Sequence, residues 1–322
     1  MRIEYSTDMA IQYLDFVTER HRIWRLRQQG TPPPWTNHPY LAIRKFTNVF
    51  RVLDWDSQWV VRNLMDPHED DHDTLARLFL FRHTGKIEAW DHFRDVVGRY
   101  PLLSDMTDGT LLKIWQEYRG RSDGVELLPN GRTKGITGKP VFTIAYQIYP
   151  GSVDDKGSDK LETIINRTTS LFQSSNVFGF FSARGAEERY NILRAHPGVA
   201  DFMAMQILTD WGYTPHCGYD QEHEFVVCGP GAVRGAKHLS PLANPRDVVD
   251  WAQELVKSDP HCPWIPLPGD RKRYPSIMDI QNTLCEFSKL VRYDTATGAI
   301  RQTKYRPAHL GVQPKLVLPA HW

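Results

Sequence analysis

Four polar side chains recur along the segment PSIMDIQNTLCEFSKLVR, which covers residues 275–292. They are Asp279, Asn282, Glu286 and Lys289. At about 100° per residue, their spacing places them within a helical stripe roughly 80° wide. Carboxylates can orient an amine or accept a proton, amides can read a base edge, and a lysine can stabilise an anion. The stripe therefore predicts one wall of a polar pocket.

The helix that carries this stripe has a clear start and a separate apolar face. After Pro275, Ser276 and Asp279 are spaced as in a capping box. The neighbouring stripe is apolar and is expected to pack on a core. It consists of Ile280, Leu284, Phe287 and Val291.

A second polar stripe is expected between Tyr40 and Leu64, where the spacing predicts one long helix. Its polar residues again fall within roughly 80°. They are Asn48, Arg51, Trp55, Gln58 and Arg62. Because both helices carry amide and charged groups beside an apolar face, we predict that the lines Asn48-Arg51-Gln58 and Asp279-Lys289 face each other across a pocket.

The segment NILRAHPGVADFMAMQILTDW predicts two helices joined by a short turn, similar to a helix-hairpin-helix element. Gly198 in this turn would allow a DNA phosphate to approach the backbone, although Ala200 replaces the usual second glycine. An ordinary helical hairpin is the alternative. Gln206 and Asp210 lie one turn apart on the second helix and either border a pocket or pair locally.

A glycine-rich segment, FVVCGPGAVRG, is expected to be a short strand-like run with a turn. Gly229 and Gly231 would let the backbone approach an anion, and Arg234 could bind a phosphate through two N–H groups. A purely structural turn is the alternative, because the phosphate-binding pattern GxxxxGK[ST] is absent.

The composition is that of an ordinary globular protein, with 41% hydrophobic and 24% charged residues. A net charge of +1 excludes a uniformly basic nucleic-acid-coating protein, so DNA binding would need a local patch. Arg292, Lys304 and Arg306 are candidates for such a patch. No apolar run reaches the roughly 18 residues of a membrane span. The four cysteines lack zinc-ligand spacing and are expected to be free thiols of a cytoplasmic protein.

A metal site is not expected. The segment PHEDDHD holds His68, His72 and three aspartates, but a solvated connector explains it better than metal ligation. The predicted fold is mostly α with a few short strands. We expect one domain over residues 1–322, with a core at 35–292, an N-terminal helical extension at 1–34 and an irregular tail at 293–322.

Five segments in order resemble the α-glutamyl/putrescinyl thymine pyrophosphorylase group. This group includes amino acid:DNA transferases of phages and the helical domain of 5-hydroxymethyluracil DNA kinases, and it is related to helix-hairpin-helix DNA glycosylases. The segments are PPPWTNHPYLAIRKFTNVFRVLDWDSQW, KPVFTIAYQI, GVADFMAMQILTDW, EFVVCGPGAVRG and SIMDIQNTLCEFSKLVR. The resemblance runs from about Trp35 to Arg292.

The resemblance implies a helix-hairpin-helix glycosylase-like fold and a reaction on DNA in a bacterial or phage-infected cytoplasm. A 5-hydroxymethyluracil base, pyrophosphorylated by a partner kinase, would exchange its pyrophosphate for an amine such as an amino acid or a polyamine. The base would be turned out of the stack, and no cofactor beyond the amine co-substrate is implied.

We assign four groups of site residues, which lie on the matching motifs except for Lys304 and Arg306. The carboxylates expected to act in catalysis are Asp210, Asp279 and Glu286. The cations expected to bind pyrophosphate are Arg51, Arg234 and Lys289. The amides expected to read the base are Asn48, Gln58, Gln206 and Asn282. The residues expected at the DNA backbone are Gly198, Gly229, Gly231, Arg292, Lys304 and Arg306.

Some positions depart from the family pattern. Trp55 stands where arginine is common, and Met205 replaces a tyrosine. The catalytic aspartate of glycosylases has no secure counterpart, since Asp220 at the expected distance falls in a polar loop. Three alternatives remain: a glycosylase that excises a modified pyrimidine, a non-catalytic DNA-binding module that partners a 5-hydroxymethyluracil DNA kinase, and a structural helical protein whose buried polar groups pair with each other.

Overall fold

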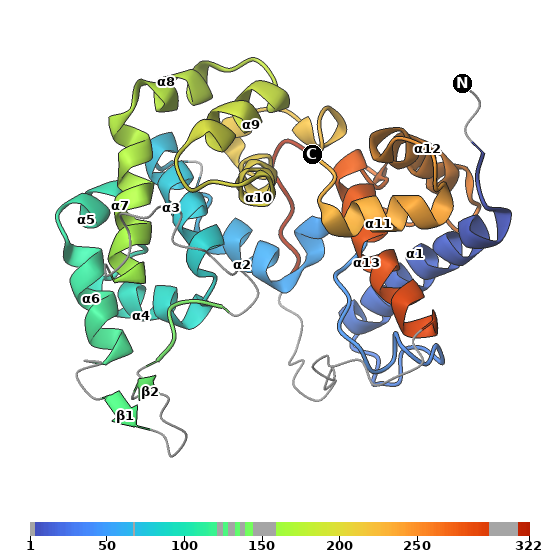
Figure 1. The fold of residues 1–322 in the computed structure, drawn as a ribbon, viewed down its shortest axis with the longest axis horizontal. Coiled ribbons are helices and arrows are strands. Elements are labelled where there is room, and N and C mark those ends of the chain that lie inside the picture. The colour runs from blue at the N-terminus through green and yellow to red at the C-terminus, as the bar shows by residue number, and fades with distance from the viewer. Residues whose placement is uncertain are drawn as a thin grey trace. The chain divides into compact units, whose positions relative to one another are not determined.

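The computed structural model describes residues 4–66, 68–120, 125–127, 133–135, 139–143, 159–295 and 315–322. Over these residues the fold is mostly α-helical, and the named strands form two small antiparallel hairpins (Figure 1). This confirms the predicted fold class. The chain divides into two compact units. The first comprises Met1–Gln58, Tyr219–Leu318 and Trp322, and the second comprises Trp59–Gly218 and Pro319–His321.

The first unit contains the helix predicted from Pro275, which is α13 (Ile277–Thr295). Its apolar stripe is buried as expected, with Ile280, Leu284 and Phe287 fully inaccessible to solvent. α13 contacts α1, α11, α12 and the short helix η4. The other elements of this unit are α1 (Thr7–Gln28), η1 (Arg51–Leu53), η4 (Gln221–His223), α11 (Pro230–Leu239), α12 (Pro245–Ser258), β3 (Ile265–Leu267) and β4 (Arg271–Arg273).

Two glycines allow α11 to approach α13 closely. A Cβ atom on Gly235 would lie 2.0 Å from the Leu284 carbonyl oxygen, and one on Gly231 would lie 2.2 Å from the Cys285 sulfur. The strand-like run predicted here is wrong: residues 225–229 form no strand, Gly229 is the N-cap of a helix, and Pro230 is its first residue. Proline is favourable there, since its missing N–H has no intrahelical partner in any case.

The long helix predicted between Tyr40 and Leu64 is also wrong. Residues 45–50 are not helical, and the regular helix begins only with α2 (Trp55–Asn63). The Asp54 carboxylate accepts a hydrogen bond from the Asn48 backbone N–H at 2.7 Å, and Arg20 donates to two carbonyls of the same segment. These side chains bind backbone groups that helix bonds would otherwise use, which periodicity alone does not reveal.

The second unit is built on α3 (Asp71–Thr84), in which every residue from Thr74 to Thr84 is buried. α3 contacts α5, α7 and α10. Because other helices surround α3, its apolar residues are not confined to one face. The second half of α2 also belongs to this unit. Its remaining elements are α4 (Ile87–Val97), α5 (Leu103–Thr107), α6 (Thr110–Arg119), β1 (Val125–Leu127), β2 (Thr133–Gly135), α7 (Lys160–Gln173), α8 (Ser175–Ser182), α9 (Ala186–Ala195), α10 (Asp201–Trp211) and η3 (Pro215–Cys217).

The predicted helical hairpin is present as α9, a short turn and α10. The turn is closed by a hydrogen bond from the Val199 N–H to the His196 carbonyl at 3.1 Å. Gly198 has a φ of +76°, a conformation that favours glycine, and the Arg167 guanidinium packs directly against it. A side chain at position 198 would therefore be strained and would displace Arg167.

Candidate functional site

The start of α13 is a buried capping box that also binds a distant part of the first unit. Asp279 accepts hydrogen bonds from the Ser276 backbone N–H at 3.0 Å and hydroxyl at 2.9 Å, and the Asp279 N–H donates back to that hydroxyl. The other Asp279 oxygen accepts from the Arg51 backbone N–H at 2.8 Å. Burial raises the pKa of Asp279, opposed by Arg273 and by these hydrogen bonds. The capping box predicted from the sequence is confirmed.

The rest of the polar line on α13 binds the same non-helical segment. Glu286 accepts a hydrogen bond from the Thr47 backbone N–H at 3.0 Å, and the Asn282 amide donates to the Asn48 carbonyl at 3.3 Å. The two predicted polar lines therefore do meet. They meet through direct hydrogen bonds at these positions, and the pocket expected between them is replaced by contact.

Gln58 shows how an amide in this region can recognise a paired donor and acceptor. Its Nε2 donates to the Val317 carbonyl at 2.8 Å, and its Oε1 accepts from the Val317 N–H at 3.0 Å. Gln58 Nε2 also donates to the Val52 carbonyl. The tail residue Val317 thus presents a donor next to an acceptor, the same pattern that the edge of a uracil base presents.

The charges of the three cations predicted to bind pyrophosphate all act on one half-buried thiol, that of Cys285. Burial raises the pKa of Cys285, Glu286 adds to this effect, and the positive charges of Lys289, Arg234 and Arg51 oppose it. Lys289 lies about one turn after Cys285 on α13, and Arg234 belongs to α11, which packs against Cys285 at Gly231.

The surroundings of Cys285 can also receive an anion. Gly231, in the first turn of α11, packs against the sulfur, so the amides at this helix end lie close by. Lys289 is bound to Glu286 at 2.6 Å, whereas Arg234 is exposed. Cationic groups beside the N-terminus of a helix are an arrangement suited to phosphate oxygens.

The predicted residues of the second unit form a separate set. Asp210 is fully buried on α10 and accepts two hydrogen bonds from the Arg82 guanidinium of α3. Gln206, one turn earlier, is also buried. A buried carboxylate held on both oxygens by an arginine is well suited to fixing α10 on α3, since breaking such a pair is costly.

The remaining predicted DNA-backbone residues fall in different places. Arg292 is exposed near the end of α13, and Gly229 is the half-buried N-cap of α11. Lys304 and Arg306 lie outside the residues that the structure describes.

A buried charge cluster was missed by the sequence analysis. Arg273 donates to both oxygens of Asp220 and to Glu222, the latter at 2.5 Å, and the Trp322 ring centroid lies 3.4 Å from its guanidinium carbon. Burial raises the pKa of Glu222 to about 8, and Asp279 adds to this effect while Arg273 opposes it. The pairing of Arg273 with a polar loop about fifty residues earlier leaves no periodic signal in the sequence.

The acidic connector before α3 has a structural role. Asp70 is the N-cap of α3 and accepts a hydrogen bond from the His72 N–H at 2.7 Å. Asp70, Asp71 and His72 lie close enough to share an ion but are partly or fully exposed. Capping accounts for Asp70 without a metal, because its carboxylate satisfies the first amides of the helix.

Over the described residues the protein is of the mostly α-helical class. One unit contains a helical hairpin, and the other contains a capped helix lined with charged residues. A family model described as "5-hmdU DNA kinase, helical domain" matches residues 7–299. The chain belongs to that family.

A curated relative supports this assignment. A protein of Bacillus phage SP10 named "5-hmdU DNA kinase" is 25% identical over 244 residues, which cover 70% of this chain and 35% of the phage protein. The chain therefore spans about a third of the length of this relative. No solved structure matches. None of the described helices combines the length and the apolar composition that crossing a membrane requires.

Proposed function

We propose that this protein modifies thymine in DNA by replacing the pyrophosphate of 5-(pyrophosphoryloxymethyl)uracil with an amine. Family membership supports a role in 5-hydroxymethyluracil chemistry. The observation that supports the transfer step is the packing of the first turn of α11 against Cys285, with Arg234 on α11 and Lys289 about one turn after Cys285 on α13. A leaving pyrophosphate needs such preorganised positive charge.

The reaction breaks the bond between the exocyclic methylene carbon and the pyrophosphate oxygen and forms a carbon–nitrogen bond. The amine nitrogen loses one proton, and pyrophosphate leaves with the bonding electron pair. We propose that Glu286 accepts the proton from the amine or orients the amine. Glu286 follows Cys285 in the chain and already binds the Lys289 ammonium. Asp279 and Asp210 are proposed to hold neighbouring parts of the protein in place. Both oxygens of each carboxylate already accept hydrogen bonds from protein groups.

Asn48, Gln58 and Asn282, the predicted base-reading amides of the first unit, are proposed to position the base. Gln58 supports this role most directly, because it already pairs with an adjacent donor and acceptor on Val317. A uracil edge offers the same pair. Gly198, Gly229, Gly231 and Arg292 are proposed to contact the DNA backbone, together with Lys304 and Arg306.

The deciding experiment uses DNA in which a cognate kinase has pyrophosphorylated 5-hydroxymethyluracil. The DNA is incubated with this protein and a mixture of amino acids and polyamines, digested to nucleosides and analysed by mass spectrometry. A new nucleoside whose mass corresponds to 5-hydroxymethyldeoxyuridine with its hydroxyl replaced by an amine establishes the transfer and identifies the donor. Free modified base and abasic sites would instead identify a glycosylase.

A second candidate function is that of a non-catalytic DNA-binding module that works with a 5-hydroxymethyluracil DNA kinase. It is favoured by the share of the phage relative that the chain matches, 35% of a protein named as a kinase. The polar groups of α13 are also largely bound to the protein itself. In this case the nucleosides stay unchanged, while adding the protein changes the rate or DNA affinity of the kinase.

A further inference from the structure

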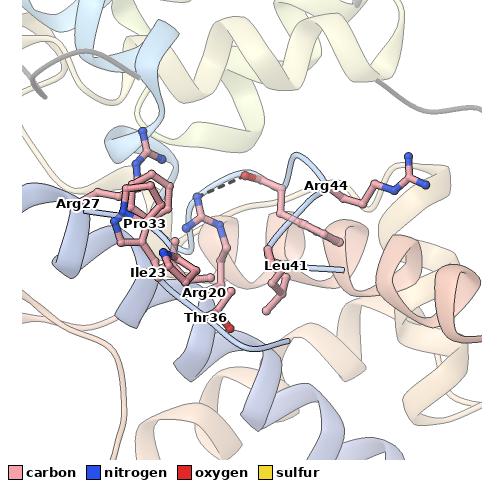
Figure 2. Close-up of a pocket in the computed structure, with 11 residues that line it drawn as sticks. Arg20, Ile23, Arg27, Pro33, Thr36, Leu41 and Arg44 are labelled. Atoms are coloured by element: carbon pink, nitrogen blue, oxygen red, sulfur yellow. Dashed lines mark hydrogen bonds between the residues drawn. The ribbon is translucent and has the colours of Figure 1, made fainter. Parts of the chain in front are cut away.

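A cavity of about 190 Å³ lies in the first unit, beside α1 and the segment that follows it. Its walls come from Arg20, Ile23 and Arg27 of α1 and from residues 33–46. Figure 2 shows Arg20 in the middle of this group, with Arg27 and Pro33 on one side and Leu41 and Arg44 on the other. None of the residues of the proposed transfer site lines this cavity.

The cavity walls are positively charged on one part and apolar on another. Three arginines line it, and none of its described lining residues is acidic. The apolar walls are formed by Ile23, Leu41 and Phe46, together with two prolines. Glu19, on the same helix as Arg20, is bound by Arg22 at 2.7 Å, so its charge is largely offset.

The arginines are held in place before any ligand arrives. Arg20 is buried and donates to the Thr47 carbonyl at 2.8 Å and to the Asn48 side chain at 2.6 Å. Arg27 lies over the Trp35 ring, 5.4 Å from its centroid, and its Nε is buried without a hydrogen-bond partner among the described residues. The Arg44 guanidinium extends away from Arg20 in Figure 2 and lies over the Tyr293 ring.

We infer that this cavity binds a small organic carboxylate with a flat or apolar body. An apolar cavity of about 150 Å³ accepts a benzene molecule, so the volume suits a ligand of this size. A carboxylate matches the fork of a guanidinium, and the apolar wall would leave a fully hydrated inorganic phosphate poorly accommodated. A cationic ligand such as a polyamine would be repelled by the same walls.

Three ligands that share a phenyl ring but differ in charge test this inference without DNA. Benzoate, benzamide and benzylamine are titrated into the full chain by isothermal calorimetry. We expect benzoate to bind at least about tenfold more tightly than benzamide, and benzylamine not to bind. Equal affinities for benzoate and benzamide, or inorganic phosphate displacing benzoate at equal concentration, would overturn the assignment.

Two variants locate the binding in the cavity. Arg27→Gln removes a lining charge and should weaken benzoate about tenfold, whereas Arg25→Gln removes a charge from the exposed side of the same helix and should not. Ala42→Leu fills part of the cavity and should weaken benzoate and benzamide together. Benzoate binding unchanged in both Arg27→Gln and Ala42→Leu places the ligand elsewhere and contradicts the inference. Because the readout is binding alone, it is independent of the transfer reaction.

Discussion

At the scale of single residues, Asp279 joins the N-terminus of α13 to the backbone of Arg51. Its two oxygens accept three hydrogen bonds from N–H and O–H groups. Asparagine in its place has one oxygen, and its NH₂ group would face a donor in a buried site. We expect Asp279→Asn to lower the free energy of unfolding by about 1–3 kcal/mol, measured by urea denaturation.

The control for Asp279→Asn is Asp294→Asn, because Asp294 is an exposed acid near the other end of the same helix. This change should stay within about 0.5 kcal/mol of the parent protein. Equal effects of the two substitutions would contradict the structural role of Asp279. The measurement also decides how a loss of activity in Asp279→Asn is interpreted, since only a folded variant reports on chemistry.

Glu222 should make the stability of the protein depend on pH. Burial raises its folded-state pKa from 4.5 to about 8, so the folded protein holds this proton more tightly than the unfolded chain does. The stabilisation is complete below about pH 4.5 and is lost as the pH rises to about 8, by at most about 1.4 kcal/mol per pH unit. Glu222→Gln has no such proton, so its stability relative to the parent should rise over this window.

Urea midpoints of the parent protein and Glu222→Gln at about pH 5 and pH 8 test this prediction. Glu224→Gln is the matched control, because Glu224 is an exposed acid two residues away. A constant difference between Glu222→Gln and the parent at the two pH values would show that Glu222 is ionised throughout.

Arg234 is the cation of the proposed transfer site that can be removed with least effect on folding. It is exposed, whereas Arg51 is buried and Lys289 is bound to Glu286. We expect Arg234→Gln to weaken binding of pyrophosphorylated DNA by about tenfold, the loss of one charge-assisted contact. Fluorescence anisotropy on modified DNA measures this affinity. Lys237→Gln, an exposed lysine on the same helix, should leave it unchanged. An equal loss in both variants would indicate a diffuse charge effect.

At the scale of elements, the crossing of α11 and α13 depends on Gly235. An added Cβ would lie 2.0 Å from the Leu284 carbonyl oxygen and 3.1 Å from the Leu284 Cα, and a backbone cannot move aside as a flexible side chain can. We expect Gly235→Ala to cost more than about 2 kcal/mol in stability, because the two helices must separate. A Cβ atom on Gly229 would have no other atom within 4 Å, so Gly229→Ala should cost at most about 1 kcal/mol in stability. Similar losses of stability in the two variants would contradict this account.

The same helix pair shows what periodicity could and could not predict. The capping box and the apolar stripe of α13 were predictable, because both depend on residues three or four positions apart. The helix of α11 was missed, since its two packing glycines are intelligible only once Leu284 and Cys285 are known to face them.

The helix predicted for the segment before α2 was wrong for a different physical reason. Residues 40–64 have helical periodicity, but Asp54 and Arg20 bind backbone groups of residues 46–48. Arg20 is more than twenty residues from this segment, so its competition for these backbone groups cannot be read from a local window. For the candidate site the sequence supplied only residue types: Arg51, Arg234 and Lys289 were chosen as cations, their charges act on Cys285, and their role in binding pyrophosphate stays a prediction.

At the scale of the whole molecule, charge is balanced and much of it is paired. The net charge is +1, with 39 basic and 38 acidic residues. Several exposed arginines are bound to acids of their own unit. They are Arg22, Arg94, Arg194 and Arg246. For the proposed function, this balance means that DNA would be held by a small number of local contacts.

This balance predicts a shallow salt dependence for DNA binding. Each phosphate that a protein neutralises on duplex DNA contributes about −0.9 to the slope of log K against log salt concentration, so three to five contacts give a slope of about −3 to −5. Arg234→Gln should make the slope less negative by about 1, while Arg246→Gln, whose cation is already bound to Asp250, should not change it. Affinities measured at several salt concentrations decide the matter. A slope steeper than about −8 would require an extended basic surface, which neither the net charge nor the pairing of these arginines supports.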